Sequence, residues 1–179
     1  MIQQKYRSAT FKKGESEDHI YAVGKVYHFL QQSIPIHTKL MVDIGPPVTY
    51  PPEILKQLPK NREYGGHTFD LGIYQIVVDM KYGLDANVPM IKPVAYIEIN
   101  GNVGYDYYDG AGRVKHANPT KHSKALQKRN DKINKNYCEL MGIKYITLLK
   151  EEIMGDIKDK DQEKNSLQYL QRELIEFLQ

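Results

Sequence analysis

The sequence contains a single cysteine, Cys138, among its 179 residues. A lone cysteine cannot form a disulfide within the chain, and it cannot supply the several thiolates of a multi-cysteine zinc site. Folds that depend on either kind of cross-link are therefore excluded. Because Cys138 lies in a segment with helical periodicity, we expect it to be buried on a helix.

Long apolar runs are also missing from the sequence. No segment approaches the roughly eighteen apolar residues that a membrane-spanning helix requires, and residues 1–19 hold no hydrophobic stretch of the secretory kind. We therefore expect a cytoplasmic protein with no membrane association. The length, with 41% hydrophobic and 26% charged residues, is typical of one globular domain with a single core.

The net charge of +3 and a pI near 8.7 permit a polyanionic partner without requiring one. The distribution is more informative than the total, because the segment 113–135 holds eight basic residues and one acid, whereas the chain after Lys150 is rich in acids. Such an excess can bind nucleic-acid phosphates without reading sequence, although a solvated helix face is the commoner cause of a charge run. The eight basic residues are Arg113, Lys115, Lys121, Lys124, Lys128, Arg129, Lys132 and Lys135.

Apolar spacing predicts an α/β fold in which a central mixed sheet is flanked by helices. We expect one domain over residues 1–179, with the C-terminal helix at 160–179 packing on the core. Residues 101–119 should form an exposed loop, and residues 48–66 a second loop with one helical turn at 52–58. Helices are predicted at 16–33, 120–142 and 159–179. Strands are predicted at 37–45, 67–83 (either continuous or bent), 94–101 and 143–152.

Two of these helices carry apolar stripes that should face the core. The helix at 120–142 has Thr120 as a candidate N-cap and Gly142 as its C-terminal stop. Its expected inward residues are Leu126, Ile133, Tyr137 and Leu140. Those of the last helix are Leu167, Leu170, Leu174, Phe177 and Leu178.

Asp70 and Glu98 lie on consecutive predicted strands. If these strands pair, the two carboxylates come within reach of one divalent cation, and hard oxygen ligands suit Mg²⁺ or Mn²⁺. Asn100 follows Glu98 by two residues, so it shares the same face and could hydrogen-bond a metal-bound water. Taken singly, Asp70 could equally well be an exposed strand residue, and Glu98 could equally well be the partner of a lysine on the outer face of the sheet.

The order of these residues resembles the PD-(D/E)xK nuclease superfamily over roughly residues 15–150. The resemblance is carried by Glu17 in an early helix, by Asp70 on a later strand, and by the tripeptide Glu98-Ile99-Asn100 at the end of the next strand, before a polar helix and a further strand. The stretch 96–148 is most similar to very-short-patch repair endonucleases and to related phage and homing-type endonucleases. This likeness implies a restriction-endonuclease-like fold, a metal-dependent endonuclease acting on DNA, and a catalytic role for the three acids.

The same likeness implies further site residues, with His116 or His122 as the loop histidine and Asp131 as the helix aspartate. The chain departs from the superfamily pattern at two positions, because Asn100 stands where a lysine is commonest and Phe69 where a proline usually precedes the aspartate. The general base is therefore open. We favour a histidine, whose pKa lies near neutrality, over a lysine of the following helix, namely Lys128, Lys132 or Lys135.

Structural roles compete with several of these assignments. Glu17 could simply favour the dipole of its helix, and Asp131 could pair with Lys128 or Lys135 along the helix surface. Three other histidines, His19, His28 and His37, are expected to be surface or packing residues.

Two functional alternatives to a DNA endonuclease stay open, namely a catalytically inactive DNA-binding or assembly protein on the same scaffold and a nuclease acting on RNA. A homodimer would suit an enzyme that cuts both strands of a duplex.

Overall fold

The computed structural model describes residues 17–58, 66–77, 90–100, 107–108, 114–115, 121–154 and 160–179. Side chains are described over residues 18–58, 66–77, 90–100, 129–154 and 163–179. None of the described helices is long and apolar enough to cross a membrane.

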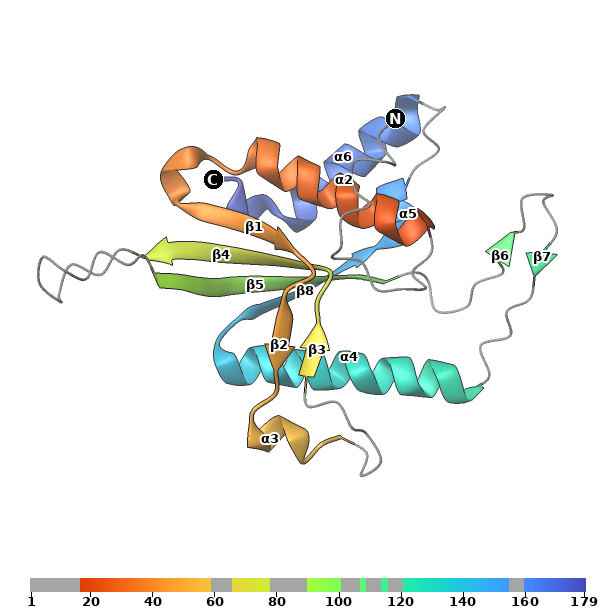
Figure 1. The fold of residues 1–179 in the computed structure, drawn as a ribbon. Coiled ribbons are helices and arrows are strands. Elements are labelled where there is room, and N and C mark those ends of the chain that lie inside the picture. The colour runs from red at the N-terminus through yellow and green to blue at the C-terminus, as the bar shows by residue number, and fades with distance from the viewer. Residues whose placement is uncertain are drawn as a thin grey trace, which may run out of the picture.

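A four-stranded mixed sheet forms the centre of the fold, with the strand order β1-β4-β5-β8. β4 runs antiparallel to both of its neighbours, whereas β5 and β8 run parallel to each other. Helices flank this sheet, so the predicted α/β class is confirmed (Figure 1). The strands are β1 (Leu40–Ile44), β4 (Leu71–Val77), β5 (Met90–Asn100) and β8 (Lys144–Leu149).

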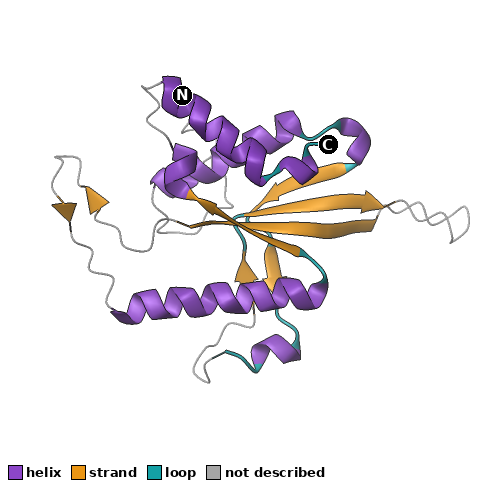
Figure 2. Cartoon of the chain, turned by 180° about the vertical axis from the view of Figure 1, so that it is seen from behind, coloured by secondary structure: helices purple, strands orange, loops and turns teal. Residues whose placement is uncertain are grey.

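The helices form layers on both faces of the sheet (Figures 1 and 2). α2, α5 and α6 lie on one face, and α4 lies on the other. These helices are α2 (Glu17–Ser33), α4 (Lys121–Met141), α5 (Lys150–Met154) and α6 (Lys160–Glu173). The short elements outside these layers include the 3-10 helices η1 (Ile36–Thr38) and η2 (Ile175–Phe177) and the paired strands β6 (Tyr107–Tyr108) and β7 (Val114–Lys115).

The larger hydrophobic core lies between the sheet and the α2 side of the molecule. Val23, Val26 and Leu30 recur at three- and four-residue spacing on α2 and are fully buried. They pack in one cluster with Leu71 and Ile97, which are paired across β4 and β5. Burying each large aliphatic side chain contributes about 1.5–3 kcal/mol relative to exposure. This core therefore holds the start of α2 beside the strands that carry Asp70 and Glu98.

A second core of mainly aromatic residues lies between the sheet and α4. The rings of Phe69 and Tyr96 stack with centroids 4.4 Å apart and planes 3° from parallel. Tyr137 of α4 packs on both rings, and the neighbouring Cys138 is fully buried, as predicted. This packing fixes the chain at Phe69, immediately before Asp70.

A small appendage, which we call the arm, connects β1 to β4 and lies on the α4 side of the sheet (Figure 1). It comprises β2 (Pro47–Thr49), α3 (Pro52–Leu55) and β3 (Gly66–Thr68), with β2 and β3 paired antiparallel. The predicted loop at 48–66 therefore contributes two short strands, and the predicted helical turn is α3. The connection at 59–65 lies outside the described residues.

Other element boundaries also differ from the sequence-based predictions. The segment 67–83 bends at Phe69 and Asp70, which separate β3 from β4, so the bent alternative holds. The strand expected at 37–45 begins only at Leu40, because η1 and the left-handed residue Lys39 (φ 54°) precede it. The strand expected at 143–152 ends earlier than predicted. β8 stops at Leu149, and α5 follows directly. The last helix, α6, ends at Glu173, and the 3-10 helix η2 follows it.

Two leucines expected in the core are exposed. Leu140 on α4 is 54% exposed, and Leu167 on α6 is 42% exposed. A helix turns by about 100° per residue, which places both side chains about a quarter turn from the centre of the buried stripe. Gly142, by contrast, has φ +67° directly after α4, as expected of a helix stop.

Candidate active site

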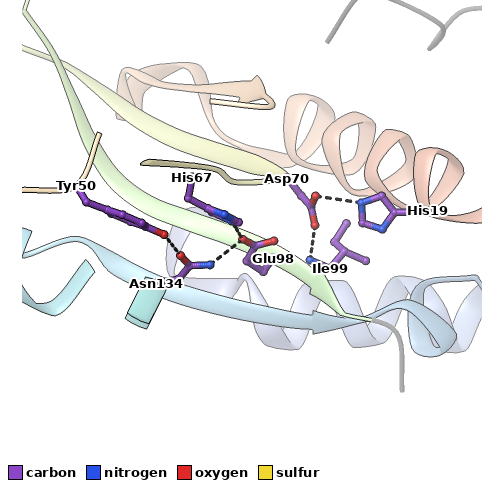
Figure 3. Close-up of polar contacts among 7 residues, drawn as sticks. All are labelled: His19, Tyr50, His67, Asp70, Glu98, Ile99 and Asn134. Carbon is purple, nitrogen blue, oxygen red and sulfur yellow. Dashed lines mark hydrogen bonds and ion pairs between the residues drawn. The ribbon is translucent and has the colours of Figure 1, made fainter. Parts of the chain in front are cut away.

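Asp70 and Glu98 lie at neighbouring strand ends. Leu71 of β4 pairs with Ile97 of β5, and Asp70 and Glu98 each lie one residue beyond this last pair, although Asp70 belongs to the bend before β4 and not to the strand itself. The Asp70 carboxylate also accepts a hydrogen bond from the backbone N–H of Ile99, with Oδ2 and N 2.7 Å apart. Asp70 is thereby fixed against the residue that follows Glu98 (Figure 3).

Each carboxylate contacts a histidine from a different element. His19 of α2 hydrogen-bonds Asp70 with Nε2 and Oδ1 3.0 Å apart, and His67 of β3 hydrogen-bonds Glu98 through Nε2 and Oε1. The Asp70 and Glu98 side chains are only 14% and 12% exposed, so these contacts are partly shielded from water. His19, which was expected to be a surface or packing residue, is 21% exposed and hydrogen-bonds Asp70. His67 did not figure among the predicted site residues.

A buried amide contacts Glu98 from the α4 side. Asn134 is 2% exposed, and its Nδ2 donates to Glu98 Oε1 at 3.4 Å. Its Oδ1 accepts a hydrogen bond from the hydroxyl of Tyr50, which lies between β2 and α3 (Figure 3). Sequence reasoning missed both residues. One signal was available, because an asparagine one residue after Ile133 and four before Cys138 lies on the buried stripe and needs polar partners there.

Asp131, the predicted helix aspartate, lies on α4 one turn before Asn134. Burial raises the pKa of its carboxyl group, and the nearby His67 offsets only part of this rise. Asp131 therefore faces the same region as Glu98. Of its proposed surface partners, Lys135 pairs with Glu139 at 4.0 Å, and the side chain of Lys128 lies outside the described residues.

The remaining predicted site residues are only partly visible. Asn100 is the last residue of β5, is half-buried, and shares a strand face with Glu98 by alternation. Glu17 is the first residue of α2, but its side chain lies outside the described residues. His116 and the side chain of His122 also lie outside them.

Three of the eight predicted phosphate-binding residues have described side chains. Arg129, Lys132 and Lys135 are exposed on α4, and Arg129 also donates to the backbone oxygen of Gln57 in the arm at 3.3 Å. The side chains of Arg113, Lys115, Lys121, Lys124 and Lys128 lie outside the described part.

The described side chains form no protein cage for a metal ion, so a cation here would have few protein ligands. Within the described residues, no group of three or more His, Cys, Asp or Glu side chains is arranged to hold a metal ion. Mg²⁺, however, is commonly bound by one or two carboxylates, with waters and substrate phosphates completing its shell. Each carboxylate oxygen has two lone pairs, so the hydrogen bonds to Asp70 and Glu98 are compatible with such an ion.

Comparisons with protein-family models, with curated proteins and with solved structures find no match to this chain.

Proposed function

We propose that this protein is a Mg²⁺- or Mn²⁺-dependent endonuclease that hydrolyses DNA phosphodiester bonds. The observation that supports this most directly is the neighbouring position of Asp70 and Glu98, with Asp70 held against the backbone next to Glu98. Two largely buried carboxylates at adjacent strand ends would offer a concentrated negative charge to a hard cation. The order of acids along the chain, which resembles the PD-(D/E)xK superfamily, supports the same proposal.

Different side chains would have different roles in hydrolysis of the scissile phosphodiester. Asp70 and Glu98 would hold the Mg²⁺, which would supply Lewis-acid polarisation of the phosphodiester and neutralise charge on the leaving oxygen. Asn100, on the Glu98 face, orients water. For proton acceptance the structure adds His67, which already contacts Glu98, to the candidates from the sequence, which are the loop histidines and the lysines of α4.

DNA is the proposed partner because α4 presents basic residues next to the site. Arg129, Lys132 and Lys135 are exposed on the helix that also carries Asp131 and Asn134. Their contacts with phosphates would position the backbone without reading bases. We further propose that the protein is cytoplasmic and that it forms a homodimer, which would suit cutting both strands of a duplex.

A cleavage assay on supercoiled DNA with Mg²⁺ tests the proposal. We expect turnover in the wild type and a loss of at least about a hundredfold in Asp70→Ala and in Glu98→Ala, because each removes a ligand of the ion. Asp43→Ala is the matched control, because Asp43 is an exposed residue of β1 whose carboxylate accepts a hydrogen bond from the N–H of the next residue, Ile44. Turnover that persists in both site variants would overturn the assignment.

Asn100 supports a second candidate, because it stands where a lysine is commonest in the superfamily. Loss of that lysine suits a catalytically inactive DNA-binding or assembly protein on the same scaffold. Salt-sensitive DNA binding by a wild-type protein that never cleaves would favour this candidate. Competition between DNA and RNA in the cleavage assay decides between a deoxyribonuclease and a nuclease acting on RNA.

A further inference from the structure

Asn134 makes two hydrogen bonds of opposite polarity in a buried position. Its amide oxygen accepts from the Tyr50 hydroxyl, and its amide nitrogen donates to Glu98 Oε1 at 3.4 Å. A lysine here could only donate, and an ionised aspartate could only accept. Asparagine therefore suits a position that must link a phenol to a carboxylate, and its 2% exposure shows that water does not readily replace either partner.

The Tyr50–Asn134 contact also joins the arm to α4. Tyr50 packs edge-to-face on Tyr137 of α4, with ring centroids 5.5 Å apart. A second link forms farther along the arm, where Asn136 Nδ2 donates to Gln57 Oε1 at 2.7 Å. This second link lies at the exposed surface and makes no contact with Glu98.

Glu98 is held from two directions as a result. The arm contributes His67, and α4 contributes Asn134, and both contact the same oxygen, Oε1 (Figure 3). A glutamate side chain has three rotatable bonds, and fixing them costs conformational entropy that must be recovered from contacts. Two contacts on Oε1 fix the carboxylate before any ligand arrives.

We infer that Asn134 is a positioning residue, which orients the Glu98 carboxylate for the cation and is itself oriented by Tyr50. The inference rests on the proposed function, because the cation is the same one that Asp70 and Glu98 are proposed to bind. Residues that orient a metal ligand typically change metal affinity by 10- to 100-fold when they are removed. Asn134 thus belongs to the site although it touches neither metal nor substrate.

Titration of the DNA-free protein with Mn²⁺ by calorimetry tests the inference without depending on cleavage. We expect Asn134→Leu, which keeps the side-chain size but removes both hydrogen bonds, to weaken Mn²⁺ binding by about 10- to 100-fold. Tyr50→Phe leaves the hydrogen bond between Asn134 and Glu98 intact. It should weaken Mn²⁺ binding only by roughly threefold to fivefold. Asn136→Ala, which breaks a different hydrogen bond between the arm and α4, should stay within about twofold of the wild type.

All titrations are run well below the melting temperature of each variant, so that a lower stability alone does not change the measured affinity. If Asn134→Leu binds Mn²⁺ like the wild type while Glu98→Ala does not bind it, the inference is wrong and the proposed function stands. If the wild type binds no Mn²⁺, both fail together. Should Asn134→Leu not fold, Tyr50→Phe decides, because a loss no larger than that of Asn136→Ala overturns the inference and a larger loss supports it.

Discussion

Cys138 shows how strongly the aromatic core controls the chemistry of a single group. Its side chain is fully buried on α4, beside Tyr137 and against the sheet. Burial, reinforced by the nearby Glu98 and Glu139, raises the pKa of its thiol to about 12. Because the thiolate is the reactive form, the native protein should carry an inert cysteine.

We expect Cys138 to react with a chromogenic disulfide reagent at pH 8 only slowly in the native protein, and completely in guanidinium. The raised pKa also makes stability depend on pH. Above about pH 9, the ordinary thiol value, the unfolded chain loses its proton while the folded chain keeps it up to about pH 12. The free energy of unfolding should therefore fall by as much as about 1.4 kcal/mol per pH unit across this range.

Cys138→Ala is the control for the pH dependence. Its unfolding free energy, measured by urea denaturation at several pH values, should fall less steeply above pH 9 than that of the wild type. Equal slopes, or rapid labelling of the native thiol, would contradict the assignment of Cys138 to the sealed core.

The arm depends on a close approach of its two strands. A Cβ atom added at Gly66 in β3 would lie only 2.2 Å from the backbone oxygen of Val48 in β2. A backbone atom cannot move aside as a flexible side chain can. Gly66 therefore permits the β2–β3 pairing that places the next residue, His67, at Glu98.

We expect Gly66→Ala to separate β2 from β3 and to reduce the free energy of unfolding by about 1–3 kcal/mol, as measured by urea denaturation. Gly142→Ala is an informative comparison, because a Cβ there meets no atom within 4 Å and the cost comes only from its φ of +67°. That cost should be about 1 kcal/mol. In addition, Gly66→Ala alone should increase amide hydrogen exchange in the arm. Unchanged exchange there would show that the close contact is not needed.

At the scale of the whole molecule, an excess of basic residues lies on one face of the sheet. The exposed Lys132 and Lys135 lie on α4, whereas α6, which holds equal numbers of acidic and basic residues, lies on the opposite face (Figures 1 and 2). This distribution would orient a duplex toward the α4 side, where Asp131 and Asn134 are found.

We expect binding of a short DNA duplex, measured by fluorescence anisotropy in EDTA, to weaken linearly with the logarithm of salt concentration. Each phosphate contact contributes about 0.9 to the slope, so Lys132→Gln with Lys135→Gln should reduce the slope by about 2. Lys164→Gln, an exposed lysine of α6, should leave it unchanged. Equal slopes for the double variant and the wild type would remove α4 from the binding face.

Local patterns in the chain are enough to predict the helices α2 and α4, the strand β5 and the α/β class, because each depends on side chains a few residues apart. The same patterns single out Asp70 and Glu98 as candidate acids, whereas Asp131 was implied only by the resemblance to the nuclease superfamily. The patterns give the wrong burial for Leu140 and Leu167, because a shift of a quarter turn around the helix moves a side chain out of the core.

The surroundings of the acids are decided only by tertiary structure. His67 and Asn134 reach Glu98 across 31 and 36 residues of sequence, His19 reaches Asp70 across 51, and Tyr50 reaches Asn134 across 84. None of these pairs has a periodic signature, since packing of the arm, α2 and α4 on the sheet creates the contacts. A histidine or asparagine looks the same in a sequence whether it faces water or a carboxylate, and only the folded chain distinguishes the two.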